Sequence, residues 1–418
     1  MTILSRAVRS LKALKAGITD SERLARRVAR IDWSEFAEAI ARSGDDGCGD
    51  VGHVLLASTG IQNTGDQAML NAFLAAVDGP VTVVVQPEST YSFARSHGDV
   101  RVEVIPELFL GGSEHHRRAL RRLAELVRSG RSFSVVGADI IDGGYHRRLA
   151  STLWAIAGAS ADAGIDTRVI GFSWNASVSG AVRQIASKAT AAGVVACVRD
   201  PRSADRAERD GLVGVQRVAD SVFTLPQPSL DVASRARLAL MNISGLLRSR
   251  LDLSQEYIEI VRWLVGAGYD VLLVPHVNNP SGSDVRAITE FYDLLPQELR
   301  SRVRTQETLL PPEDVQRLAA TAEIVVTGRM HLAILASTVG TPAIVVATQG
   351  KVEGLMDLLG LPGWGVEPGE GLGASVIRVL KQYDEDSASV RQQLAIGVDA
   401  ARALAMQNFV GLVESGAR

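Results

Sequence analysis

The residues best suited to chemistry in this sequence lie in the segment Gly328-Arg329-Met330-His331. The segment follows an apolar strand-like run at 323–327 and precedes an apolar helical stretch at 332–339. Backbone N–H groups and the positive end of a helix favour anions at such a strand-to-helix turn. Arg329 adds a guanidinium fork that suits a carboxylate or phosphate, and His331 adds a group that can move a proton near neutral pH. The segment therefore predicts catalysis on a small anionic substrate.

Strand and helix patterns that alternate along the chain must position these residues. Strands are predicted over 53–58, 81–86, 101–105, 133–136, 167–172, 194–198, 237–243, 271–274, 324–327 and 343–346. Helices are predicted between them, over 114–128, 149–163 and 254–266. This rhythm is typical of βαβ units in parallel sheets, so we expect an α/β fold.

A proline-marked connection at 224–228 divides the pattern into two halves. We expect an N-terminal Rossmann-like domain over 51–225, a second one over 226–385 and a C-terminal helix over 386–418. Ligands of open α/β sheets bind beyond the carboxyl ends of the strands. The chemistry is therefore expected in a cleft between the two domains.

Composition indicates a soluble enzyme. The chain has 418 residues, 46% of them hydrophobic and 22% charged, a balance typical of globular proteins. The formal net charge of −3 gives no global attraction to nucleic acid, which is not expected as a partner. Cys48 and Cys197 form neither a CxxC pair nor a disulfide framework, so a cytoplasmic location is expected.

The first fifty residues are expected to be a basic helical extension and linker. Eight basic and two acidic side chains among the first thirty residues give a local charge of 8 − 2 = +6. Such a helix either packs on the body or on a partner subunit, or lies on the anionic inner face of a membrane. The sequence leaves both alternatives open, and with them the oligomeric state.

Polar side chains follow two strands of the first half. Asn63 and Asp66 follow the strand at 53–58, and either they hold sugar hydroxyls in the cleft or Asp66 only caps a helix that begins near Gln67. Asp139 and Asp142 follow the strand at 133–136, where they contact acceptor hydroxyls or satisfy the N–H groups of a turn.

Three basic side chains also follow predicted strands. Arg199 is a natural anion ligand, although a salt bridge to a nearby carboxylate is the alternative. His276 lies just past the strand at 271–274 and is a candidate substrate ligand, although a histidine at such a position is more often structural. Lys351 follows the strand next to the one before Arg329, so it is expected to reach the same ligand. The histidines show no metal-ligand spacing, and no metal site is expected.

Taken in order, these motifs resemble the polysaccharide pyruvyl transferase family over about residues 52–365. The matching segments are Asn63-Thr64-Gly65-Asp66, Gly137-Ala138-Asp139, Ile170-Gly171-Phe172-Ser173, Arg199-Asp200-Pro201-Arg202-Ser203, Gly328-Arg329-Met330-His331, Gly340-Thr341-Pro342 and Gly350-Lys351-Val352-Glu353-Gly354-Leu355. The Arg-Met-His element and the Gly-Lys element are the specific ones.

The resemblance implies a GT-B-like fold, with two Rossmann-like domains that face each other across a cleft. It implies transfer of the enolpyruvyl group of phosphoenolpyruvate to a sugar of a polysaccharide, glycolipid or lipid-linked glycan. The product is a cyclic pyruvate ketal, and phosphate is released. The first domain would hold the acceptor and the second the donor, with no cofactor besides the donor itself.

The resemblance also suggests roles for the site residues. Arg199, Arg329 and Lys351 would bind the carboxylate and phosphate of the donor. His331 would deliver or remove a proton. The side chains of Asn63, Asp66 and Asp139 would face the acceptor or organise loops.

Two alternatives remain at this stage. The first is a GT-B glycosyltransferase with a nucleotide-sugar donor, in which Glu353 or Asp357 would bind the ribose. The second is a non-catalytic member that binds a glycan or holds a synthase complex at the membrane.

Overall fold

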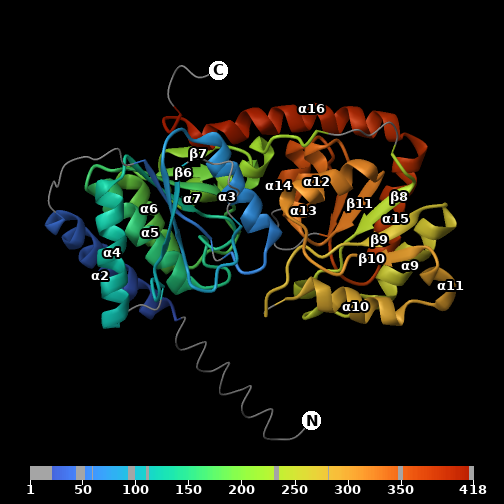
Figure 1. Cartoon of the computed structure of the whole chain (residues 1–418), viewed down its shortest axis with the longest axis horizontal. Coiled ribbons are helices and arrows are strands. Elements are labelled where there is room, and N and C mark those ends of the chain that lie inside the picture. The colour runs from blue at the N-terminus through green and yellow to red at the C-terminus, as the bar shows by residue number, and fades with distance from the viewer. Residues whose placement is uncertain are drawn as a thin grey trace, which may run out of the picture.

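Two parallel β-sheets covered by helices lie side by side in the computed structural model of the chain (Figure 1). The structure describes residues 21–43, 52–58, 60–92, 99–109, 113–229, 235–280, 282–346 and 352–413. The predicted α/β fold with two Rossmann-like halves is confirmed. Residues 1–20, most of the predicted basic helix, and Lys351 lie outside the described residues.

The first sheet has seven strands in the order β3-β2-β1-β4-β5-β6-β7, all paired in parallel. They are β1 (His53–Leu56), β2 (Val81–Val85), β3 (Val100–Val104), β4 (Ser132–Val136), β5 (Asp166–Phe172), β6 (Val195–Val198) and β7 (Val215–Arg217). Strand order reverses between β1 and β4. Ligands bind at such a switch point in doubly wound sheets, so the carboxyl ends of these strands are the expected location of a site.

Helices cover both faces of the first sheet. They are α2 (Glu22–Arg42), α3 (Thr64–Ala76), α4 (Glu114–Ser129), α5 (Arg147–Asp162), α6 (Gly180–Ala191), α7 (Pro201–Arg209) and the short 3-10 helix η1 (Ser221–Thr224). Side chains cap several of them: Ser113 accepts from the N–H of His116 in α4, and Asp200 accepts from the N–H of Ser203 in α7. The apolar face of α2, with Trp33 and Phe36, packs on α4 and α5.

The start of α3 corrects one prediction. A helix that begins near Gln67 with Asp66 as its N-cap is wrong, because α3 begins at Thr64. Asn63 is the N-cap, and its Oδ1 accepts a hydrogen bond of 3.0 Å from the N–H of Gly65. Asp66 is thereby released from capping and lies buried in the first turn.

The second sheet has six strands in the order β10-β9-β8-β11-β12-β13, again all parallel. They are β8 (Leu238–Met241), β9 (Asp270–Leu273), β10 (Val303–Thr305), β11 (Ile324–Thr327), β12 (Ala343–Val346) and β13 (Gly365–Val366). Its helices are α8 (Gly245–Arg248), α9 (Ser254–Gly266), α10 (Asp284–Leu294), α11 (Gln297–Arg300), α12 (Pro312–Thr321), α13 (Met330–Thr338), α14 (Val352–Leu358) and α15 (Leu372–Glu385).

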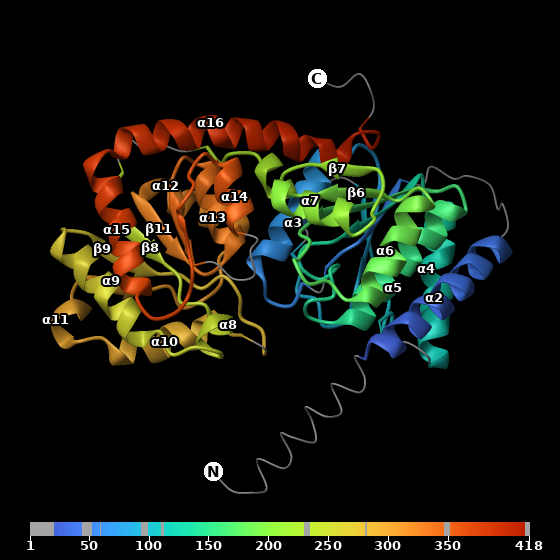
Figure 2. The same ribbon diagram turned by 180° about the vertical axis from the view of Figure 1, so that it is seen from behind.

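The last long helix, α16 (Ser387–Met406), runs along both halves (Figures 1 and 2). Just beyond it, Asn408 accepts a hydrogen bond of 3.1 Å from the N–H of Gly171 in β5 and donates one of 2.9 Å to the carbonyl of Ala219. Phe409 packs edge-on against Phe73 of α3 at 6.0 Å between ring centroids. The end of the chain therefore joins the hydrophobic core of the first half to that of the second.

No helix in the described ranges is both long and apolar enough to cross a bilayer.

Candidate functional site

His331 reaches from the second half of the molecule to the first. It lies in the first turn of α13, directly after β11, and its side chain is 14% exposed. Its Nε2 lies 3.3 Å from Oδ2 of Asp220, although the direction is not that of a good hydrogen bond. The other side of the ring packs against Gly65, where a Cβ would come within 2.3 Å of Nδ1. The absence of a side chain at Gly65 thus makes room for the imidazole.

Asp220 joins His331 to a buried ionic cluster at the carboxyl edge of the first sheet. Its Oδ2 accepts a hydrogen bond of 2.7 Å from Nη1 of Arg199. Nη2 of Arg199 pairs with Asp139, and Nε donates to Oγ of Ser173 at 2.8 Å. These residues follow β7, β6, β4 and β5, which are neighbours in the sheet, so parallel pairing brings their ends together.

The pKa values of two buried carboxyl groups near His331 are shifted in opposite directions. Burial disfavours the charged form of Asp220, but the charges of His331 and Arg199 outweigh it and lower the pKa of Asp220 to about 2. Burial raises the pKa of Asp66, although His331 and the N–H of Gly60 act in the opposite direction. Asp220 is therefore a fixed negative charge, and Asp66 is a carboxyl group that takes up a proton more readily.

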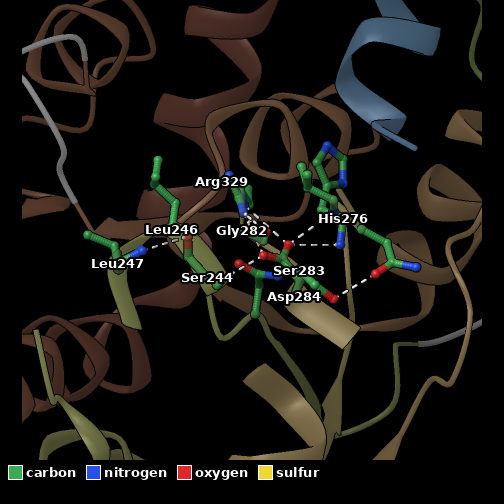
Figure 3. Close-up of polar contacts among 12 residues, drawn as sticks. Ser244, Leu246, Leu247, His276, Gly282, Ser283, Asp284 and Arg329 are labelled. Atoms are coloured by element: carbon green, nitrogen blue, oxygen red, sulfur yellow. Dashed lines mark hydrogen bonds and ion pairs between the residues drawn. The ribbon is translucent and has the colours of Figure 1, made fainter. Parts of the chain in front are cut away.

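Arg329 is held by a second buried carboxylate, Asp284 (Figure 3). Its Nη2 donates to Oδ1 of Asp284 at 2.7 Å and to the carbonyl of Gly282 at 3.0 Å. Asp284 also accepts hydrogen bonds from Asn242 and from the backbone N–H groups of Gly245, His276 and Val277. Among the described residues, Nη1 of Arg329 has no hydrogen-bond partner, so it is the part of the fork that remains for a ligand.

His276 lies between the two clusters. Its ring points away from the carboxylate of Asp284, which binds its backbone N–H (Figure 3). The ring is buried, and neither nitrogen has a hydrogen-bond partner among the described residues. Burial, followed by the nearby charges of His331 and Arg329, lowers the pKa of His276 well below its ordinary value. The ring of His276 is consequently a neutral group beside His331 and Arg329.

Backbone contacts fasten the two halves together beside these rings. The carbonyl of His276 accepts a hydrogen bond of 3.1 Å from the N–H of Thr64, and Asn63 forms a β-bridge with Val277. The loop after β1 thus carries Asn63 and Asp66 to the same interface as His276.

The structure brings most of the predicted site residues together. Arg199 and Asp139 pair directly, Asp220 connects them to His331, and Asp66 and Arg329 lie near that histidine and His276. Lys351 lies outside the described residues. In the parts of the chain that the structure describes, no three His, Cys, Asp or Glu side chains form a group that could hold a metal ion.

Sequence analysis missed two residues of the site, Asp220 and Asp284. Asp220 follows β7, a three-residue edge strand of the sequence Val-Gln-Arg whose side chains are largely exposed, so no apolar pattern marks it. The signal that could have found it is the segment Val218-Ala219-Asp220, where a buried acid follows two buried apolar residues. Asp284 follows Ser283, the N-cap of α10, and looks like an ordinary acidic residue in a first helical turn.

This arrangement combines two arginines, each paired with acids, with an imidazole that one of those acids faces. A histidine beside a fixed carboxylate can accept and return a proton. The neighbouring cations favour an anionic substrate in a site from which water is largely excluded.

A family model described as polysaccharide pyruvyl transferase matches residues 63–350, more than half of the chain. No curated protein sequence matches. The fold resembles that of a putative UDP-N-acetylglucosamine 2-epimerase from Listeria monocytogenes, with a TM-score of 0.60 and 14% identity over 87% of this chain and 95% of that one. It also resembles the Anabaena protein HepE, solved in complex with UDP and glucose, with a TM-score of 0.53 and 14% identity over 87% of this chain and 97% of that one. At these identities the similarity is one of fold, and that fold is GT-B-like.

Proposed function

Because the chain belongs to the polysaccharide pyruvyl transferase family, we propose that it transfers the enolpyruvyl group of phosphoenolpyruvate to two hydroxyls of a sugar. The acceptor is a polysaccharide, a glycolipid or a lipid-linked glycan. The observation that carries the proposal is the position of His331, between the Asp220–Arg199 pair of one half and Arg329 of the other.

The reaction needs one proton on the methylene carbon of the donor. Protonation there makes the neighbouring carbon electrophilic, and a sugar hydroxyl adds to it. The bond from that carbon to the phosphate oxygen breaks, and a second hydroxyl closes the ketal. Of the two hydroxyl protons released, one replaces the proton given to carbon and the other leaves with phosphate, so the balance is closed.

His331 is the proposed proton carrier. Its Nε2 faces the fixed charge of Asp220 at 3.3 Å, which can orient the ring for proton transfer. Arg329, through Nη1, and Lys351 are the proposed ligands of the donor's phosphate and carboxylate. Each nitrogen of the buried Arg199 already has a partner in Ser173, Asp220 or Asp139, so we propose that it acts on the donor through Asp220 and His331.

Asn63, Asp66 and Asp139 are proposed to face the acceptor or hold its loops. Asp66 is the strongest of the three, because it is buried near His331 and its pKa is raised by burial. Its carboxylate can accept a hydrogen bond from an acceptor hydroxyl or take up the proton of that hydroxyl. Binding of the enzyme to the inner face of a membrane through residues 1–20 stays part of the proposal.

The test is incubation of the purified chain with phosphoenolpyruvate and a panel of glycolipids and neutral oligosaccharides. We expect release of inorganic phosphate together with a gain in acceptor mass that corresponds to one pyruvate ketal. Phosphate release without a modified acceptor, or no consumption of phosphoenolpyruvate by any mixture, contradicts the proposal.

One observation favours a nucleotide-sugar transferase as the second candidate. Oε2 of Glu353, in the first turn of α14, is buried and has no hydrogen-bond partner among the described residues, so it is available to a ribose hydroxyl. The other candidate, Asp357, pairs with Arg202 at 3.0 Å. Thermal unfolding with phosphoenolpyruvate and with UDP-sugars in parallel separates the two functions, because the true ligand raises the midpoint. We expect phosphoenolpyruvate alone to do so.

A further inference from the structure

A hollow of about 420 Å³ lies between the two halves, next to the ionic site. The loop after β1 forms one wall and the segment 307–312 after β10 forms the other, with Asn278 from the loop after β9 between them. Its polar lining includes the side chains of Gln62, Asn63, Asn278 and Glu307.

The hollow offers neutral hydrogen-bonding groups and one carboxylate. In the described part of the chain, no hydrogen bond engages the amide of Gln62, the Nδ2 groups of Asn63 and Asn278, or the carboxylate of Glu307. None of the described residues that line the hollow is lysine, arginine or histidine. Amides that both donate and accept, with a carboxylate that accepts from neighbouring hydroxyls, match a polyhydroxylated, uncharged ligand.

The backbone of Gln62 is strained, and contacts from both halves hold it in that conformation. Its φ of 42° lies in the left-handed region, which a side chain disfavours. Its N–H donates to Oγ1 of Thr90 at 2.7 Å, and its carbonyl accepts from the N–H of Asn278 at 2.8 Å. Backbone strain that is held this way is concentrated at functional sites. The two hydrogen bonds therefore fix the backbone position from which the side-chain amide of Gln62 extends.

The hollow lies about one sugar ring from the proposed reaction centre. Gly65 packs against His331, while Thr64 and Asn63 line the hollow. Consecutive Cα atoms are about 3.8 Å apart, so these two positions lie within about 4–8 Å of Gly65. A sugar at His331 would therefore place its linked neighbour in the hollow.

We propose that Gln62, Asn63, Asn278 and Glu307 form a saccharide subsite, which binds the uncharged sugar next to the one that receives pyruvate. The acceptor is then at least a disaccharide unit. The link to pyruvate rests on the proposed function, whereas the binding of a neutral saccharide does not.

The test uses saturation-transfer NMR of the full chain with methyl glycosides of neutral disaccharides, covering α- and β-linked glucose, galactose, mannose and their N-acetylamino forms. We expect at least one disaccharide to bind. Glu307→Gln should weaken its binding about tenfold, because a charge-assisted hydrogen bond is lost, and Asn278→Ala about threefold or more. The matched control Glu298→Gln, an exposed acid on α11, should leave binding unchanged.

Thermal unfolding of each variant checks that it is folded. The variant Thr308→Trp should abolish disaccharide binding, because the larger side chain fills the hollow from its rim. The subsite is overturned if no disaccharide binds, or if Glu307→Gln, Asn278→Ala and Thr308→Trp all bind as the unchanged chain does. If disaccharide binding follows the expected pattern but phosphoenolpyruvate is never consumed, the subsite stands and the proposed function fails. If phosphoenolpyruvate is consumed and these variants have no effect, the function stands and the subsite fails.

Discussion

Arg199 and Arg329 lie one in each half, each just beyond the end of a parallel strand, yet their acidic partners differ. Arg199 is shared between Asp139 and Asp220, and Asp220 also faces His331. Among the described residues, Asp284 is the one acidic partner of Arg329, and that carboxylate also accepts hydrogen bonds from Asn242 and three backbone N–H groups.

From this difference we infer that the Asp220 cluster serves the chemistry and that the Asp284 cluster supports the fold. A change of charge in the Asp220 cluster is felt by His331, because one oxygen touches both Arg199 and the imidazole. The Asp284 cluster instead fastens the ends of β8 and β9 to the start of α10. We therefore expect the first cluster to set activity and the second to set stability, with only Nη1 of Arg329 turned to a ligand.

Removal of His331 should have the largest effect. His331→Ala is expected to lower kcat/KM for phosphoenolpyruvate by about 10²–10⁴-fold, because a positioned acid–base group is lost. Phosphate release measures the effect, and His115→Ala, at an exposed histidine of α4, is the matched control. Near-normal turnover of phosphoenolpyruvate by His331→Ala would show that neither cluster acts on the reaction through His331.

The isosteric pair Asp220→Asn and Asp284→Asn tests the comparison directly. Asn at 220 should present an N–H group to His331 and lower kcat about 100-fold, with a shifted pH profile. Asn at 284 should cost about 3–5 kcal/mol in the free energy of unfolding, because a buried arginine loses its counter-charge and several donors lose an acceptor. Denaturant unfolding and pH–rate profiles of both variants are the measurements, and exchanged outcomes would reverse the assignment.

Gly65→Ala tests the position of His331 without a change of charge. The added Cβ would lie 2.3 Å from Nδ1, so the ring must move. A displacement of this kind can cost about 100-fold in rate. In Gly266→Ala, at the end of α9, the Cβ meets no atom within 4 Å, so activity should be kept. Equal activity of the two variants would mean that contact with the loop after β1 does not position the imidazole.

The pH dependence of stability should show the smallest effect. The folded pKa of Asp220, about 2, lies below the ordinary value of 3.8 for an aspartate, so the carboxylate stabilises the fold above about pH 4. That contribution, about 2 kcal/mol, is lost as the pH falls from about 4 to 2. The pKa of Asp66 is raised instead, so its contribution is present at low pH and lost as the pH rises through the folded pKa. In Asp220→Asn, the free energy of unfolding should therefore depend less on pH in the acid range. Asp66→Asn should raise the midpoint of unfolding at pH 7, and a lower midpoint there would contradict the sign given for Asp66.

Strands with an apolar pattern could be predicted from the sequence, and so could the polar residues that follow their ends. The strands before Arg199 and His331 are apolar and almost entirely buried, and parallel pairing then places both side chains at the edges of their sheets. The strands β7, β10 and β13 were not predicted, because each has only two or three residues and too few apolar positions to form a pattern.

Contacts between residues that are far apart in the sequence were harder to predict than the positions of strands along the chain. The pairing of Arg199 with Asp139 and Asp220 depends on strand order, which the sequence does not state. The start of α3 was misplaced because Asn63 and Asp66 are both good caps; in the structure Asn63 caps the helix and Asp66 instead accepts a hydrogen bond from the N–H of Gly60. Such choices are made by tertiary packing and not by local propensity.

The contact of Asn408 with β5 has a consequence for synthesis of the chain. Asn408 and Gly171 are 237 residues apart, and translation at about 5–20 residues per second delivers the second roughly 10–50 s after the first. During that interval the N–H of Gly171 and the carbonyl of Ala219 have no Asn408 to bind, and the core around Phe73 lacks Phe409. The first half can thus collapse on the ribosome but reaches its final form only after the last helix has been made.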